Sequence, residues 1–298
     1  MYELAITLIS HSEGRIDVDN VSGFVAAFQR VAALTIGELW AIPAMLRLGL
    51  IENVRRMALR AVQRLDEMEA ADAAAASIAR AGESGREALD GALNRFASHP
   101  PPLTPTFVSR FVQQLRQEAG SQPALLRLEQ WIADEAMSPQ EATTRSTERM
   151  AITQVVMANS ITSLRAIARM NWRAFVEGQS RMEPILREDP SGFYSRMTFA
   201  TRDRYRHIVE RIAKRTRHPE EAVARSALEC ARAGPEPDPM DPRRRHVGYF
   251  LIGPGLVELE RMNGYRPTVP ETIDRWVRRH PNVVFVGGVL TATLAALA

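Results

Sequence analysis

Cysteine and lysine are almost absent from this chain of 298 residues. Cys230 is the only cysteine, which excludes an intrachain disulfide and a cysteine-based metal site and fits a reducing compartment. Lys214 is the only lysine, so arginine carries nearly all of the positive charge. Acidic residues are interleaved with the arginines, and the net charge is only +3. Because no basic patch stands out, we expect no nucleic-acid partner.

Signals for export and for β-structure are also missing. The N-terminus lacks the basic region, apolar run and cleavage site of a signal peptide, and no βαβ alternation or internal repeat is visible. Alanine, leucine and arginine are abundant instead. The sequence predicts an all-α fold, a multi-helix bundle with long central helices. Helices are expected at 2–12, 18–32, 36–80, 86–97, 105–118, 123–136, 139–168, 172–187, 202–216, 219–233 and 270–280.

Local signals mark where several of these helices begin and end. T-I-G-E at 35–38 and S-P-Q-E at 138–141 have the spacing of capping boxes, in which two side chains satisfy the first free backbone N–H groups. The segment 99–105 is expected to be extended, because each proline disfavours the helical conformation of the residue before it. The proline-rich segment 233–245 is expected to be a linker from its composition. H-V-G-Y-F-L-I-G-P-G at 246–255 is expected to be a short strand or a docked loop.

Residues 34–53 form the most apolar internal segment, with only Glu38 and Arg47 charged among the first eighteen residues. A central core helix and a membrane span both fit this pattern, and the core helix is favoured because each charge would cost roughly 2.5–3.5 kcal/mol near a bilayer centre. Pro43 is expected to kink or restart the helix. The stripe expected to face the core comprises Ile51, Val54, Ala58, Val62 and Leu65.

The C-terminal residues 283–298 are uncharged and mostly apolar. Arg275, Arg278 and Arg279 precede them, with Trp276 in the same segment. Basic residues and tryptophan commonly flank a membrane span, although a span needs about twenty residues. The favoured prediction is the start of a truncated transmembrane helix, and the alternative is a buried C-terminal helix. The expected divisions are therefore a helical domain (1–233), a linker (234–245), a juxtamembrane segment (246–282) and this helix (283–298).

Candidate chemistry is sparse. Asp17 and Asp19 form a D-x-D motif, but no strand precedes it, and capping of a helix explains it better. T-I-D-R-W at 272–276 departs by one letter from the Q-x-x-R-W signature of processive sugar polymerases, so membrane anchoring is favoured over catalysis. The histidines lack metal-site spacing. We therefore assign no catalytic, cofactor-binding or metal-binding residue to this chain.

The segment 197–216 has an amphipathic pattern. The apolar residues along one face are Tyr205, Ile208, Val209 and Ile212. A charged surface beside them comprises Asp203, Arg206, His207 and Glu210. A solvated helix face is the favoured interpretation of that charged surface, and a docking surface for another domain is the alternative.

Four segments, together with the basic and apolar C-terminal run, resemble the bacterial cyclic β-1,2-glucan synthases in the same order. They are VAALTIGELWAIPAMLRLGLIENVRRMA (31–58), ANSITSLR (158–165), DPSGFYSRMTFATRDRYRHIVERIA (189–213) and RRHVGYFLIGPGLVELE (244–260). Members of this family are large inner-membrane enzymes that build and close β-1,2-glucan from UDP-glucose, with a membrane glycosyltransferase domain and a C-terminal phosphorylase-like region.

The resemblance implies that this chain is a fragment, the helical cytoplasmic region ahead of the transferase. Residues 1–280 would lie on the cytoplasmic side of the bacterial inner membrane, and the partners would be the membrane and the remaining transferase and phosphorylase-like domains. UDP-glucose and a divalent cation would bind outside the chain, which would not be catalytic alone. The competing hypotheses are a free-standing tail-anchored helical scaffold or interaction protein and a self-contained enzyme that uses Asp17 and Asp19.

Overall fold

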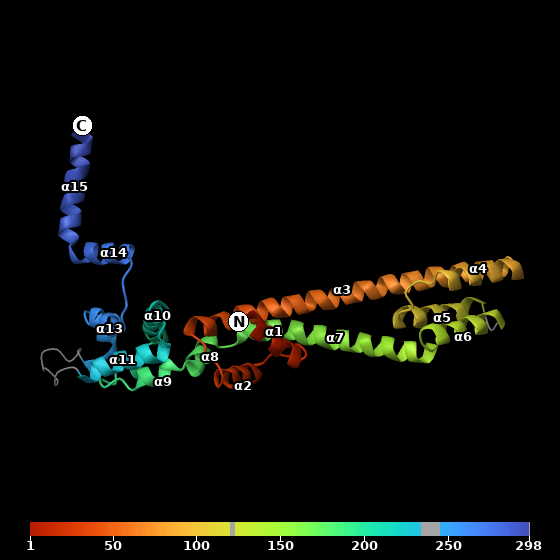
Figure 1. Cartoon of the computed structure of the whole chain (residues 1–298), viewed down its shortest axis with the longest axis horizontal. Helices are drawn as coiled ribbons and strands as arrows, with labels where there is room; N and C mark the ends of the chain where they lie inside the picture. The colour runs from red at the N-terminus through yellow and green to blue at the C-terminus, as the bar shows by residue number, and fades with distance from the viewer. Residues whose placement is uncertain (120–122, 234–244, 298) are drawn as a thin grey trace. The chain divides into compact units, whose positions relative to one another are not determined.

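The computed structural model describes residues 1–119, 123–233 and 245–297 (Figure 1). All regular structure in these ranges is helical, so the all-α prediction is confirmed. The chain divides into two compact units. The first unit comprises Met1–Val25 and Ala41–Asn171, and the second comprises Ala26–Trp40 and Trp172–Ala298. The predicted division at 233, 245 and 282 stays a prediction, and its linker lies almost entirely outside the described residues.

The first unit is built on two long helices, α3 and α7. The helices that belong to it wholly or in part are α1 (Tyr2–His11), α2 (Val18–Gln29), α3 (Ile36–Glu83), α4 (Arg86–Ser98), α5 (Pro105–Ala119), α6 (Pro123–Glu135) and α7 (Pro139–Arg169). Both predicted start signals function as caps. Thr35 and Glu38 bond to each other's backbone N–H at 2.8 and 3.3 Å, and Ser138 accepts from the Glu141 N–H.

One core of the first unit lies around the C-terminal half of α3. Ala71, Ala75 and Ile78 of α3 pack there with buried residues of α4, α5, α6 and α7. Phe111 of α5 stacks on Phe96 of α4 with ring centroids 4.9 Å apart. These small and aromatic side chains let the five helices approach closely, and ion pairs such as Arg110 with Asp72 close the edge.

A second core surrounds residues 41–57 of α3. Leu46 and Leu50 are fully buried, and α1 crosses α3 at Gly49, where an added Cβ would lie 2.6 Å from Ile9. Asn53 of α3 donates to Ser160 of α7 at 2.9 Å within this core. The core-helix interpretation of residues 34–53 is confirmed.

The structure corrects three local predictions. Helix α3 is continuous through Pro43, so the proline does not restart it. The stripe predicted to face the core is exposed instead, with Ile51 at 57%, Val62 at 53% and Leu65 at 64% of their surface accessible. The segment 246–255 contains a short helix, α12 (Val247–Leu251), and not a strand, because no neighbouring strand is present among the described residues to complete its hydrogen bonds.

The second unit is an assembly of shorter helices. They are α8 (Trp172–Gln179), α9 (Met182–Arg187), the 3₁₀ turn η1 (Tyr194–Arg196), α10 (Phe199–Thr216), α11 (Glu220–Ala233), α12, α13 (Leu256–Met262), α14 (Val269–Arg279) and α15 (Pro281–Leu297). The single helix predicted at 172–187 is interrupted after Gln179. In the described residues, no helix is both long and apolar enough to cross a membrane, so the predicted transmembrane segment lacks structural support.

The two leucines at 46 and 48 provide a matched stability test. Leu46→Ala removes a fully buried side chain and should lower the unfolding free energy by about 2–5 kcal/mol, whereas Leu48→Ala, 51% exposed, should change it by less than about 1 kcal/mol. Urea denaturation followed by circular dichroism measures both values. Equal midpoints for the two variants would contradict the core position of Leu46.

Candidate functional site

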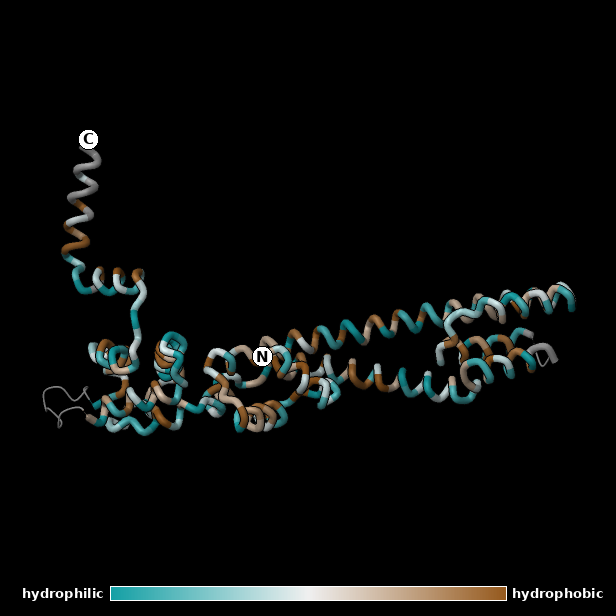
Figure 2. Tube along the Cα trace, viewed as in Figure 1, coloured by the Kyte–Doolittle hydropathy of each residue, from teal (hydrophilic) through white to brown (hydrophobic). Residues whose placement is uncertain are grey.

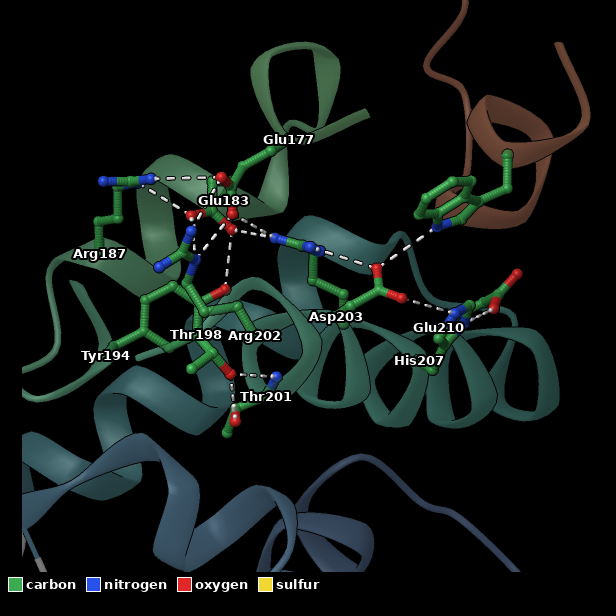
Figure 3. Close-up of polar contacts among 12 residues, drawn as sticks. Glu177, Glu183, Arg187, Tyr194, Thr198, Thr201, Arg202, Asp203, His207 and Glu210 are labelled. Carbon is green, nitrogen blue, oxygen red and sulfur yellow. Dashed lines mark hydrogen bonds and ion pairs between the residues drawn. The ribbon is translucent and has the colours of Figure 1, made fainter. Parts of the chain in front are cut away.

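The second unit contains a cluster of charged side chains that converge from four helical segments (Figure 3). We call it the charge cluster. Its members are Glu177 of α8, Glu183 and Arg187 of α9, Tyr194 of η1, and Arg202, Asp203 and Arg206 of α10. The four-residue spacing of Arg202 and Arg206 places both guanidinium groups on one face of α10. Thr198 caps the start of this helix by accepting from the Thr201 N–H.

Arg206 lies at the centre of the charge cluster with none of its side-chain surface exposed. Its Nη1 donates to Glu183 at 2.7 Å and to Glu177 at 3.1 Å, and its Nη2 donates to Asp203 at 3.2 Å. The guanidinium also lies over the ring of Phe199, 5.0 Å from the centroid. Three carboxylates and an aromatic face thus replace most of the water that the buried cation has lost, and only its Nε has no hydrogen-bond partner among the described residues.

The carboxylate of Glu183 is nearly as buried, with 4% of its side chain exposed. It accepts from Arg206, from the Tyr194 hydroxyl at 2.8 Å and from Arg187 Nε at 2.9 Å. Arg202 forms a two-pronged pair with Glu177 at 2.7 and 2.9 Å. Each carboxylate of the charge cluster is therefore committed to at least one arginine.

The pKa shifts of three cluster residues keep each of them in one protonation state, with Glu177 and Arg206 charged and Tyr194 neutral. The hydrogen bond from Arg202 lowers the pKa of Glu177 despite the opposing effect of burial. Burial and the Glu183 carboxylate raise the pKa of Tyr194 far above its ordinary value of 10.0. Burial alone would lower the pKa of Arg206, but its bond to Glu183 and the neighbouring Tyr194 raise it overall. A general acid or base needs a pKa near the working pH, and these three groups lack one.

Trp40, from the N-terminal part of α3, contacts the same cluster. Its indole N–H donates to Asp203 at 3.3 Å, and its ring meets Phe199 edge-on at 6.2 Å. Because Trp40 and Asp203 are far apart in sequence, this bond fixes the start of the longest helix onto α10 within the second unit.

The charged face predicted to be solvated is largely buried. Arg206 is completely buried and Glu210 is 8% exposed, whereas His207 is about half exposed and contacts Asp203 and Glu210. The helical periodicity of α10 was read correctly, but its partners Glu177 and Glu183 come from other helices. No local sequence signal marks these partners, because Glu177 and Glu183 lie 29 and 23 residues from Arg206.

A second polar junction joins the segments 189–194 and 246–248. Asp189, fully buried, accepts from the Val247 N–H at 3.0 Å and lies 2.8 Å from His246 Nδ1. The other ring nitrogen of His246 lies 3.3 Å from the Tyr205 hydroxyl. A Cβ on Gly248 would lie 2.3 Å from that hydroxyl, so any other residue there would displace Tyr205 or His246. Burial would raise the pKa of Asp189, but these bonds lower it overall.

A cavity of about 250 Å³ lies in the second unit beside the start of α3. Its charged and polar lining comprises Thr35, Arg181, Lys214, His218, Glu220 and Glu221. The Glu220 carboxylate accepts from the Ile36 N–H at 3.0 and 3.1 Å, which satisfies a free donor at the helix start. Burial raises the pKa of Glu220 to about 7, and the carboxylates of Glu210 and Glu38 add to the rise.

The motifs singled out in the sequence lie in separate helical settings. Asp17 accepts from the Asn20 N–H at 2.9 Å and caps α2, so the capping interpretation is confirmed. Arg275 is paired with Glu260, and Trp276 is 51% exposed on α14. The D-x-D and T-I-D-R-W motifs belong to different units. Within the described part of the chain, no group of three or more His, Cys, Asp or Glu side chains is arranged to hold a metal ion.

Replacing Glu220 tests the effect of its raised pKa. A carboxyl whose pKa is about 7 in the folded chain, against an ordinary 4.5, stabilises the fold least when it is ionised. Stability attributable to Glu220 should therefore fall as pH rises from about 5 to about 8.

Glu220→Gln keeps an oxygen acceptor for Ile36 and cannot ionise. We expect it to be more stable than the parent chain at pH 8 by on the order of 1 kcal/mol, and equal to it near pH 5. Thermal unfolding of both proteins across this range measures the difference, in which all other titrations cancel. A difference independent of pH would contradict the raised pKa.

Comparison with known proteins shows that the chain is similar to one part of a much longer protein. No protein-family model matches it. The cyclic beta-(1,2)-glucan synthase NdvB of Rhizobium meliloti (strain 1021) is 28% identical to it over 302 residues. The alignment covers 99% of this chain but 10% of the synthase, so the chain spans about a tenth of the length of that relative. The resemblance indicated by the sequence is confirmed: along nearly its whole length, this chain is similar to part of a cyclic β-1,2-glucan synthase.

Proposed function

We propose that this chain is a non-catalytic helical part of a membrane-bound cyclic β-1,2-glucan synthase, and that it supports or regulates the glucosyltransferase. The observation that carries the proposal is the match of 99% of the chain to a tenth of such a synthase. The charge cluster supports the proposal further. Each of its carboxylates is paired with an arginine and is therefore not available to bind the metal ion of a sugar nucleotide. The remaining transferase and phosphorylase-like regions would be the partners, and UDP-glucose with its divalent cation would bind there.

We further propose that the chain is attached to the bacterial inner membrane through α14 and α15, with residues 1–280 on the cytoplasmic side. The polar face of α14 is bound to the rest of the second unit through Arg275 with Glu260 and Glu271 with Tyr265. Its apolar residues Val269 and Ile273 are 73% and 56% exposed. A helix normally buries its apolar face, so this reversed arrangement favours contact with an apolar phase outside the protein.

Helix α15 extends the apolar surface. Its side chains Val283, Val284, Phe285, Val286 and Val289 are exposed, and Phe285 is accessible over 72% of its surface. Their insertion in lipid would remove a patch that otherwise drives aggregation in water. The same surface suits the alternative function, a free-standing tail-anchored scaffold protein, which would carry the anchor without a transferase.

One experiment tests both proposals. The chain, expressed in a bacterium without a glucan synthase, should sediment with membranes, and these membranes should transfer no labelled glucose from UDP-glucose with magnesium or manganese. A variant lacking residues 283–298 should leave the membrane fraction with its helicity unchanged.

Glucose transfer that is lost in the double variant Asp17→Asn, Asp19→Asn would overturn the non-catalytic role. Retention of the shortened variant on membranes, or loss of its cooperative thermal transition, would overturn the membrane attachment. The two results are read from separate measurements, so one proposal can fail without the other.

A further inference from the structure

Helix α3 is apolar on two opposite faces. At about 100° of rotation per residue, Leu50, Asn53 and Met57 lie on one face, and all three are buried. The opposite face carries exposed apolar side chains. They are Leu48 (51% exposed), Ile51 (57%), Leu59 (53%), Val62 (53%) and Leu65 (64%). Hydrophobic residues recur along α3 (Figure 2). Surface leucines occur singly in many proteins, but a continuous stripe marks an interaction surface.

The spacing of this outer stripe is that of a coiled coil. Positions 48, 51, 55, 58, 62, 65 and 69 follow one another at alternating steps of three and four residues. Such steps average about 3.5 residues and keep a seam facing a partner helix. The seven residues are Leu48, Ile51, Arg55, Ala58, Val62, Leu65 and Glu69. We call this set the seam.

The part of α3 around Val62 has little support from its own unit. Residues 58–63 are all exposed, between the core at 41–57 and the core that begins at Ala71. Isolated helical turns gain little stability in water and depend on packing of an apolar face. A partner helix on the seam would supply that packing over the stretch where the described chain does not.

The two charged residues of the seam identify the partner. Arg55 is the third residue of the seam, with 60% of its side chain exposed and a 2.7 Å bond to Glu52. Glu69 is the last residue of the seam and is exposed. In a parallel pair of identical helices, Arg55 would face Arg55 and Glu69 would face Glu69, which is repulsive.

An antiparallel pair of identical helices has the opposite result. When Val62 of one copy packs on Leu65 of the other, the two-fold axis passes between these two positions. The contact between Val62 and Leu65 therefore occurs twice. Arg55 then lies opposite the turn that carries Glu69 and Asp72 in the other copy. Because Asp72 is already paired with Arg110 of its own chain, Glu69 is the acid that would attract Arg55. Charges of opposite sign therefore meet on both sides of the two-fold axis, with Ala58, Val62 and Leu65 between them.

We propose that the seam of α3 binds the seam of a second copy of this chain in an antiparallel coiled coil. The interface is isologous, so it closes after two copies and does not propagate. Arg55 and Glu69 set its register and direction, and Ile51, Val62 and Leu65 supply its buried apolar surface. This pairing involves the first unit alone and is independent of the membrane attachment.

Charge reversal in the full chain tests the pairing. Sedimentation equilibrium in a mild detergent should show a monomer–dimer equilibrium for the parent chain. Arg55→Glu or Glu69→Arg alone should weaken dimerisation by at least about tenfold, because each places like charges opposite one another twice. The double variant Arg55→Glu, Glu69→Arg, and an equimolar mixture of the two single variants, should recover dimers.

Arg60→Glu is the matched control, since it makes the same charge change on an exposed residue about 160° around the helix from Val62. It should leave the dimer unchanged. A parent chain that stays monomeric at all concentrations would overturn the proposal and favour a different helix as the occupant. Equal weakening by Arg55→Glu and Arg60→Glu, or no recovery in the double variant and the mixture, would also overturn it. Circular dichroism verifies that each variant is folded.

Discussion

The arrangement of the second unit depends on the burial of one cation, Arg206. A guanidinium with no exposed surface is tolerated only if carboxylates surround it, because an unpaired buried charge costs several kcal/mol. Glu177 of α8, Glu183 of α9 and Asp203 of α10 meet this requirement. Because these three carboxylates come from α8, α9 and α10, the burial of Arg206 holds the three helices together.

The same requirement extends beyond the three helices. Asp203 also binds the indole of Trp40, so the start of α3 is fixed by an acid that Arg206 already holds. Tyr194 links Glu183 to the segment 189–194, where Asp189 holds His246 and Val247. Residues 189–194 and 246–247 lie in two of the segments, 189–213 and 244–260, by which the chain resembles the glucan synthases. Such a network of buried ion pairs fixes the relative positions of the helices that it joins, and this agrees with the proposed supporting role.

Local features of the fold were predictable from the sequence, and long-range ones were not. Helix limits followed from periodicity, and the caps at Thr35, Ser138 and Asp17 followed from side chains that bond within one turn. The sequence prediction placed the wrong face of α3 in the core. Both faces are apolar, and the face that is buried depends on which helices pack against α3. Arg206 was assigned to solvent because its partner Glu183 lies 23 residues away, and no local pattern records that pairing.

The most direct test of this account compares two carboxylates that differ in burial. Glu183 is bound to Arg206 at 2.7 Å, whereas Glu188 forms an exposed 2.7 Å pair with Arg232. Glu183→Gln leaves the buried guanidinium short of negative charge and should lower the unfolding free energy by about 3–5 kcal/mol. Glu188→Gln should lower it by no more than about 1 kcal/mol. Urea denaturation of the two variants measures these values, and equal, small losses would contradict the dependence of the second unit on Arg206.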